Sequence, residues 1–243
     1  MKFPSDLLEA LRAAQHIAVL TGAGASAESG VPTFRDAQTG LWAQFDPEEL
    51  ATPEAFRRNP KLVWEWYAWR RTLVERAQPN PGHFALVEME RHAPQFTLIT
   101  QNVDGLHQLA GSRNVIELHG NIRRYKCFAC ETPHSGPLPE GEIPTCASCG
   151  GLLRPDVVWF GECLPAQAYR VALEAAQTCD VFFSVGTSGL VEPAASLPRI
   201  ARRALATVVT INLDVKTEWS PNAYAIHGKS GEVLPALVSA AWG

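Results

Sequence analysis

The 243-residue sequence predicts an α/β fold in which a parallel sheet carries a small, separate metal-binding module. Short apolar runs of the kind that form buried parallel strands alternate along the chain with longer helical stretches. This alternation stops between residues 120 and 154, where the sequence is rich in Cys, Gly and Pro and shows little periodicity. The first apolar run also leads directly into a glycine-rich loop. These three observations predict one sheet-based domain with one inserted module.

The expected elements follow the chain in a simple order. The N-terminal stretch is an amphipathic helix, because Leu7, Leu8 and Leu11 fall on one face. Asn59-Pro60 breaks a long helical region, and residues 79–82 (PNPG) form a turn. Strands are expected at 17–20, 96–100, 115–118, 157–160, 181–185 and 207–212. Further helices are expected at 52–78, 83–91, 103–109, 165–178, 193–204 and 230–241.

The composition favours a globular protein of the cytoplasm, with no nucleic-acid partner and no membrane span. Hydrophobic residues make up 46% of the chain and charged residues 19%, which is typical of soluble globular proteins. The net charge of −4 gives no electrostatic case for a nucleic-acid partner. No apolar run is long enough to cross a membrane, and the N-terminus lacks the pattern of a signal peptide. In such a protein, six cysteines favour a metal site over disulfides.

The loop at residues 22–35 (GAGASAESGVPTFR) follows the first expected strand. Its glycines allow a tight backbone path, and exposed N–H groups after a strand suit a pyrophosphate. The pattern matches a dinucleotide-binding turn only in part, since Ala27 stands where the third glycine belongs. A plain turn between a strand and a loop is the simpler interpretation of a bare G-x-G. Phe34 and Arg35, an aromatic face and a fixed cation just beyond the glycines, favour a ligand.

Two Cys-x-x-Cys pairs lie inside the inserted module, separated by fifteen residues. Four thiolates match the tetrahedral coordination of Zn²⁺, and each pair can offer two sulfurs to one ion. Because four protein ligands leave no open position, we expect the zinc to be structural rather than catalytic. Reduced thiol pairs or disulfides are the alternative. The predicted ligands are Cys127, Cys130, Cys146 and Cys149.

Polar or small residues follow four of the expected strands directly, at 101–104, 119, 186–188 and 212–214. Ligands of open α/β sheets bind at the carboxyl ends of strands, so these segments predict one shared ligand. His119 is the candidate general base, because imidazole titrates near neutral pH, and His107 is its rival. Taken alone, Asn102 could simply cap a helix, and a lone histidine at a strand end is most often structural.

Several motifs together identify a family. They are the loop at 22–35, TQNVDGLH at 100–107, HG at 119–120, the two Cys-x-x-Cys pairs, RPDVVWFGE at 154–162, GTS at 186–188 and NLD at 212–214. In this order, and over nearly the whole chain, the sequence resembles the sirtuins, the NAD-dependent protein-lysine deacylases. The resemblance implies a Rossmann-like parallel sheet with helices on both faces, plus a small zinc-binding domain.

The resemblance also implies boundaries and roles. It places the NAD-binding domain at 1–50, 79–119 and 154–243, a helical insertion of the small domain at 51–78 and the zinc module at 120–153. His119 and Asn102 are the implied catalytic residues, with His119 as the base. The implied NAD-binding residues are Gly22, Ala23, Gly24, Ser26, Phe34, Arg35, Gln101, Asn102, Val103, Asp104, Gly186, Thr187, Ser188, Asn212, Leu213, Asp214 and Ser230. The substrate peptide is implied to pair, through its backbone, with a strand that contains Val157, Trp159, Phe160 and Gly161.

The reaction that the resemblance implies consumes NAD as a co-substrate. The acyl-lysine oxygen attacks C1′ of the nicotinamide ribose and nicotinamide leaves. His119 then removes a ribose proton so that the 2′-oxygen attacks the acyl carbon, and water completes the release of lysine and 2′-O-acyl-ADP-ribose. In this scheme the zinc can lie far from the reaction.

Two helical residues bear on the acyl group. Tyr67 and Arg70 are three positions apart on an expected helix and therefore share a face. A phenol beside a guanidinium can bind a carboxylate, and Ala51 would keep the pocket wide. This combination resembles the sirtuins that remove succinyl, malonyl and glutaryl groups, so we expect both deacetylation and desuccinylation. A surface aromatic–arginine pair on a Trp-rich helix is the simpler interpretation.

Other functions remain possible from the residues alone. A regulator that binds NAD without turnover is disfavoured because the His119, Asn102 and Asp104 positions are all filled. An ADP-ribosyltransferase would use the same C1′ chemistry with another acceptor. A zinc-bearing nucleic-acid module is weaker, since the chain has no sustained basic stripe. A monomer whose partners are acylated lysine side chains of proteins is the default expectation.

Overall fold

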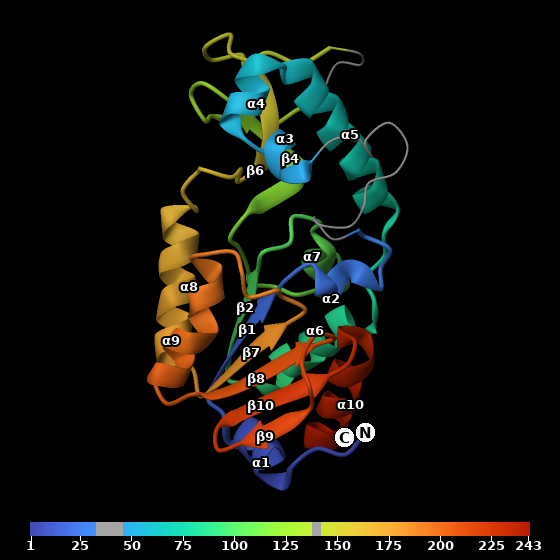
Figure 1. Cartoon of the computed structure of the whole chain (residues 1–243), viewed down its shortest axis with the longest axis vertical. Helices are drawn as coiled ribbons and strands as arrows, with labels where there is room; N and C mark the ends of the chain where they lie inside the picture. The colour runs from blue at the N-terminus through green and yellow to red at the C-terminus, as the bar shows by residue number, and fades with distance from the viewer. Residues whose placement is uncertain (33–45, 138–141) are drawn as a thin grey trace.

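The computed structural model describes residues 1–32, 46–137 and 142–243. Its larger part is a seven-stranded sheet in the order β3-β2-β1-β7-β8-β10-β9 (Figure 1). All neighbours pair in parallel except β9, which runs antiparallel to β10. The strands are β1 (His16–Thr21), β2 (Gln95–Thr100), β3 (Val115–Glu117), β7 (Val181–Val185), β8 (Thr207–Asn212), β9 (Glu218–Ser220) and β10 (Ala223–His227). Since the chain order reverses between β1 and β7, the sheet has the switch point at which open α/β sheets bind ligands.

Helices cover both faces of this sheet, as predicted. All six residues of β1 are buried, and Ile17 and Val19 contribute to a core beneath α1 (Ser5–Ala13), α6 (Pro81–His92) and α10 (Ser230–Trp242). Ala18 and Leu20 point to the opposite face, into a core beneath α8 (Ala166–Thr178) and α9 (Leu197–Arg203). A strand buried on both faces accounts for the continuous apolar run in the sequence.

A smaller unit lies beyond the carboxyl ends of the strands (Figure 1). It combines the helices α3 (Pro47–Leu50), α4 (Pro53–Arg58) and α5 (Pro60–Arg76) with a three-stranded antiparallel sheet. That sheet has the order β5-β4-β6, built from β4 (Gly120–Cys127), β5 (Pro133–His134) and β6 (Leu153–Val157). Aromatic side chains of α4 and α5, among them Phe56 and Trp66, form its core with Ile122 and Trp159. The helices thus supply most of the hydrophobic core of the smaller unit. The described part of the cysteine-rich stretch adds a small hydrophobic cluster around Leu153.

The strand expected at 157–160 was wrong. The observed strand is β6, which ends at Val157 and pairs antiparallel with β4 in the small sheet, outside the parallel one. Beyond it, the N–H groups of Val158 and Phe160 donate to the carbonyls of His119 and Ala51, which lie on different segments. The residues after Val157 therefore form an irregular segment, which follows the small sheet and leads back toward the large unit.

Other element boundaries also differ from the sequence expectation. The helix expected at 83 begins at Pro81, because the Asn80 side chain accepts hydrogen bonds from the N–H groups of Gly82 and His83 and caps the helix earlier. The helix expected at 103 begins at Leu106, after Gly105 in a left-handed conformation (α7, Leu106–Ala110). Strands β9 and β10 were not predicted from the sequence.

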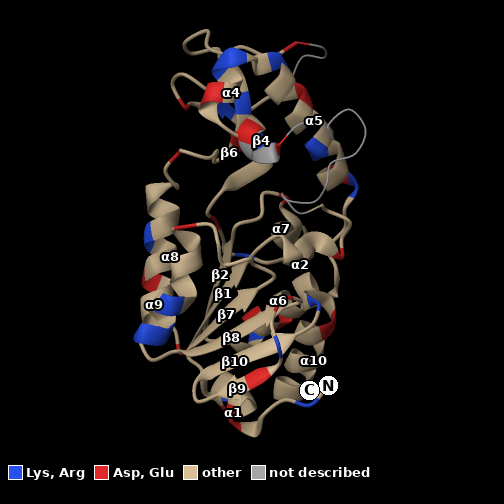
Figure 2. Cartoon of the chain, in the orientation of Figure 1, with Lys and Arg blue, Asp and Glu red and all other residues tan. Residues whose placement is uncertain are grey.

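The remaining helices are short. They are α2 (Gly24–Ala27), directly after β1, and a 3₁₀ turn, η2 (Ala194–Ser196), ahead of α9. Within the described ranges no helix is both long and apolar enough to cross a bilayer. Acidic and basic residues both occur on the small unit and around the large sheet (Figure 2).

Candidate active site

The ends of β1 and β7 are joined by unusually close backbone contacts. Gly24 donates its N–H to the Gly186 carbonyl at 2.8 Å, and Gly22 donates to the carbonyl of Val185 at 2.9 Å. A Cβ on Gly24 would lie 2.8 Å from the Gly186 Cα, and one on Gly186, whose φ is +59°, would lie 2.4 Å from the Ala25 nitrogen. Glycine is therefore needed here for one loop to cross the other. The crossing brings the predicted segments 22–26 and 186–188 side by side.

Asn102 connects the end of β2 to the same crossing. Its side-chain N–H₂ donates to the Gly22 carbonyl at 3.0 Å and to the Ser26 hydroxyl oxygen at 3.1 Å. Both amide hydrogens are thus used within the protein, and among the described residues the amide oxygen has no hydrogen-bond partner. The amide is held in one orientation with an acceptor left for a ligand.

Asp104 is the buried carboxyl of this network. It accepts hydrogen bonds from the Leu106 N–H at 2.9 Å and from the Ser26 hydroxyl. Burial raises the pKa of Asp104, while those two hydrogen bonds and the charge of Arg123 oppose the rise. Ser26 thus links Asp104 to Asn102, so the three predicted residues form one connected group.

His119 lies after β3, where the large sheet passes into the small one. Its Nδ1 is 3.0 Å from the Gln101 carbonyl oxygen, which can only accept, so Nδ1 carries the proton and Nε2 has a free lone pair. Burial lowers the pKa of His119 below its ordinary value, and the bond to Gln101 opposes this only in part. A neutral imidazole with a fixed tautomer and an available Nε2 is the form that a general base requires.

The rival histidine is placed differently. His107 is 1% exposed, and its Nε2 lies 2.9 Å from the Thr21 hydroxyl, which is itself bonded to Thr100. Burial lowers the pKa of His107 to about 3. His107 is therefore a neutral part of the core beneath the site and has no access to a substrate.

Thr187, which follows β7, is hydrogen-bonded to residues at the ends of two other strands, β2 and β8. Its hydroxyl oxygen accepts from the Gln101 side chain at 3.0 Å, and its carbonyl accepts from the Asn212 side chain at 2.8 Å. Ser188, Leu213 and Asp214 are exposed beside it. Val103 is turned toward the small unit, where its carbonyl accepts from the Ile122 N–H. The strand ends that the sequence predicted to converge do so, and in the order of the sheet.

Ser230 has a less direct relation to the site. It is 4% exposed, and its hydroxyl lies within reach of Glu28 (3.4 Å) and of the Ala25 carbonyl (3.5 Å). Its side chain therefore faces the protein beneath α2. Phe34 and Arg35 lie outside the described residues.

Sequence reasoning missed His83, which lies on α6 below Ser26. Its ring lies against that of His107 in a tilted arrangement with centroids 4.7 Å apart, and its Nε2 is 3.5 Å from the Ser26 hydroxyl. Its Nδ1 accepts from the Asn80 N–H, so the Asn-x-x-His spacing of a helix cap was the signal that could have revealed it. Burial lowers the pKa of His83 to about 4.

The four predicted zinc ligands form one cluster. Their sulfur atoms all lie within 4.8 Å of one another. Backbone N–H groups of Ala129 and Gly151 point at the sulfurs of Cys127 and Cys149 at 3.3 and 3.4 Å, which favours thiolates. Four converging thiolates with this support fit a structural Zn²⁺. Outside the cluster, Cys179 is buried and Cys163 is exposed.

Tyr67 and Arg70 share a face of α5, as their spacing predicted. Tyr67 is 2% exposed, and its oxygen lies 2.9 Å from the indole nitrogen of Trp159. Burial raises the pKa of Tyr67 to about 12, so the phenol keeps its proton. Arg70 lies over the Trp66 ring at 5.1 Å, and Ala51 is buried in the same core.

The segment after β6 connects Tyr67 to His119, the predicted base. Val158 donates its N–H to the His119 carbonyl at 2.9 Å, and the next residue, Trp159, contacts Tyr67. Phe160 is 41% exposed beside them. One irregular segment therefore touches both the predicted base and the predicted acyl-binding tyrosine.

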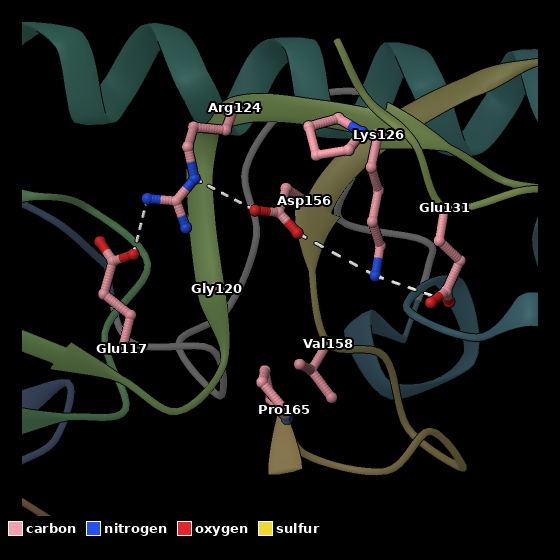
Figure 3. A pocket seen from close by; sticks show the side chains of 9 residues that line it. Glu117, Gly120, Arg124, Lys126, Glu131, Asp156, Val158 and Pro165 are labelled. Carbon is pink, nitrogen blue, oxygen red and sulfur yellow. Dashed lines mark hydrogen bonds and ion pairs between the residues drawn. The ribbon is translucent and has the colours of Figure 1, made fainter. Parts of the chain in front are cut away.

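An open pocket of about 370 Å³ borders the same segment (Figure 3). Gly120, Val158 and Pro165 form one side of it. Opposite them stands a row of alternating charges in which Arg124 bridges Glu117 and Asp156 at 2.7 and 3.1 Å. The pocket lies where the two units meet, and two of its lining residues, Gly120 and Val158, adjoin His119 in the chain or by a hydrogen bond.

These features define a class before any relative is considered: a two-part protein with a Rossmann-like dinucleotide site and a four-thiolate structural metal site. Comparison with known proteins narrows the class. The model of the Sir2 family matches residues 22–193, which is more than half of the chain. The chain belongs to the Sir2 family.

Individual relatives agree over nearly the full length. A protein of Methylococcus capsulatus named NAD-dependent protein deacylase is 51% identical over 99% of this chain and 98% of its own. A crystal structure of a Sir2 homologue bound to NAD shares 45% identity and a TM-score of 0.90, covering 99% of this chain and 94% of its own. A mutant Sir2 homologue in complex with 2′-O-acetyl-ADP-ribose shares 46% identity and a TM-score of 0.89, covering 98% and 96%.

Proposed function

We propose that the chain is an NAD-dependent protein-lysine deacylase that removes both acetyl and succinyl- or malonyl-type groups. The products are free lysine, nicotinamide and 2′-O-acyl-ADP-ribose. The observation that carries the proposal is the segment after β6, which contacts His119 through Val158 and Tyr67 through Trp159. It lies between a base suited to ribose chemistry and a phenol–guanidinium pair suited to an acyl carboxylate.

NAD supplies the electrophilic C1′ carbon, from which nicotinamide departs with the electron pair of the broken bond as the acyl oxygen takes its place. The residues of this chain orient the ligand and remove a proton from its ribose. Asn102 offers its amide oxygen to the ligand, since both of its amide hydrogens are bonded to Gly22 and Ser26. Asp104 and Ser26 fix that amide from behind.

His119 accepts the ribose proton at Nε2. The Gln101 carbonyl stabilises the imidazolium that results, because Nδ1–H already points at it. Proton removal leaves the 2′-oxygen free to form a bond to the acyl carbon, and the later addition of water releases the amine of lysine. The proton on His119 returns during this breakdown.

The acyl end is proposed to lie at Tyr67 and Arg70. The Tyr67 hydroxyl keeps its proton and can donate, while the Arg70 guanidinium carries positive charge on the same helix face. A succinyl or malonyl carboxylate is the ligand that this pair suits, whereas an acetyl group makes no polar contact there.

The test is turnover of matched peptides. Purified protein, loaded with zinc, is incubated with NAD and peptides that differ only in carrying acetyl-lysine or succinyl-lysine, and mass spectrometry follows peptide and nicotinamide. Loss of both acyl groups, with one nicotinamide per lysine released, is expected. Acetyl turnover alone would remove the carboxylate pocket from the proposal, and NAD binding without turnover would favour a regulator.

A further inference from the structure

The hydrogen bond between Trp159 and Tyr67 lies entirely inside the small unit. Trp159 is 1% exposed and Tyr67 2% exposed, and Nε1 and the phenolic oxygen are 2.9 Å apart. An indole nitrogen can only donate. The direction of this hydrogen bond is therefore certain: Trp159 donates and the Tyr67 oxygen accepts.

This direction constrains the single hydrogen of the Tyr67 hydroxyl. An oxygen that accepts from Trp159 must point its own hydrogen elsewhere, and within the described ranges that hydrogen has no acceptor. The phenol cannot avoid the problem by ionising, because burial raises the pKa of Tyr67 to about 12. Because this buried hydrogen has no acceptor among the described residues, it is available to donate to a ligand that supplies one.

Trp159 is itself held firmly. The Arg154 guanidinium lies 3.2 Å from the centre of its ring, and the Phe56 ring lies 5.4 Å away. The Trp159 backbone N–H donates to Glu162 at 2.8 Å, and Glu162 forms an ion pair with the buried Arg154. The indole cannot turn away from Tyr67 without breaking these contacts.

We infer that Trp159 is a positioning residue for acyl specificity: its indole N–H orients the Tyr67 hydroxyl as a donor toward an acyl carboxylate. This inference rests on the proposed function and deepens it. A hydroxyl that accepts a hydrogen bond also becomes a stronger donor, which adds to the effect of orientation. An acetyl group offers no acceptor at this place, so the effect is confined to acyl chains that end in a carboxylate.

The experiment is Trp159→Phe, which removes the N–H and keeps an aromatic ring. We expect kcat/KM for the succinyl peptide to fall about fivefold, the value of one hydrogen bond, mainly through KM. The acetyl peptide should lose clearly less, so the succinyl-to-acetyl ratio falls. A matched control is Trp64→Phe, the same substitution at an indole that packs against Tyr125, and it should not change the ratio.

A double-mutant cycle with Tyr67→Phe separates positioning from general packing. If Trp159 acts through the Tyr67 hydroxyl, Trp159→Phe should have little further effect on the ratio once that hydroxyl is gone. Thermal unfolding of each variant shows whether it is folded. Should Trp159→Phe be unstable, incorporation of benzothienylalanine at 159 keeps the bicyclic ring and replaces N–H by sulfur.

The outcomes are distinct. Equal loss on both peptides, an unchanged ratio, or full additivity with Tyr67→Phe would overturn the inference while the deacylase proposal stands. A wild-type protein that removes acetyl but no succinyl would overturn the carboxylate pocket and, with it, the role of Trp159. A reduced ratio that disappears in the Tyr67→Phe background supports the inference.

Discussion

The two units of the molecule build their halves of the candidate active site by different means. On the large sheet, the crossing of Gly24 with Gly186 joins the strand ends, and backbone carbonyls of Gly22 and Gln101 hold the side chains of Asn102 and His119. On the small unit, side-chain contacts among Trp159, Tyr67 and Arg154 place the groups that would meet the acyl chain. An arrangement that depends on backbone carbonyls and on the path of the main chain is hard to alter by substitution. An arrangement that depends on side-chain contacts can be altered by changing a single residue. The comparison predicts that the reaction carried out at the large sheet stays the same, whereas acyl specificity, determined by the small unit, can be changed by substitution.

Removal of the metal tests whether the small unit depends on it. Cys146→Ser, or a strong chelator, should abolish turnover of both peptides, because structural zinc contributes on the order of 10 kcal/mol to the folding of such modules. Metal content and thermal unfolding are measured alongside activity. Cys163→Ser, which changes an exposed cysteine outside the cluster, is the control and should behave as wild type. Full activity in protein shown to contain no zinc would contradict this prediction.

Substitution of the base tests the sheet side. His119→Ala should lower kcat for both acyl peptides by about 10²- to 10⁴-fold, since it removes the proton acceptor. Folding and NAD binding, followed by thermal unfolding and calorimetry, should change little. His227→Ala, an exposed histidine at the end of β10, is the control. A larger loss with one peptide than with the other would mean that His119 contributes to acyl selection.

Arg70→Met tests whether the small unit determines acyl specificity separately from the reaction at the large sheet. Desuccinylation should fall by about tenfold or more, as expected for a lost charge-assisted hydrogen bond, while deacetylation falls far less. Arg71→Met is a close control, because the Arg71 guanidinium lies over the Tyr125 ring and near Glu75. The measurement is kcat/KM on the matched peptides. Equal losses on both would remove Arg70 from carboxylate recognition.

The smallest expected effect concerns acid stability of the core below the site. The pKa of His107 is lowered to about 3, so its neutral form contributes fully to stability above pH 6.5, and this contribution is lost as the pH falls toward 3. Between pH 6.5 and 5 the loss is about 2 kcal/mol for one such group. His107→Asn should flatten the dependence in urea unfolding measured at several pH values. An unchanged slope would assign the effect to other groups, His83 first.

Much of this arrangement could be predicted from the sequence. The apolar run at β1, the polar residues after four strands and the Cys-x-x-Cys spacing are local patterns, and each has one dominant physical cause. The strand at 157–160 was wrong because Val157 and Trp159 pack into the core of the small unit, and the N–H groups of Val158 and Phe160 pair with separate segments. Likewise, nothing local to Trp159 reveals that its indole meets Tyr67, 92 residues away. Contacts of that kind depend on the finished fold.

The large sheet ends at both sides in a strand of three residues, β3 and β9. At the β9 side, all three residues are exposed and one of them is the charged Glu218. Long, flat and apolar edges invite other chains to add a strand, which is how sheets begin to aggregate. The short borders of this sheet leave little template for such growth, and this bears on how the protein behaves at high concentration as much as on what it catalyses.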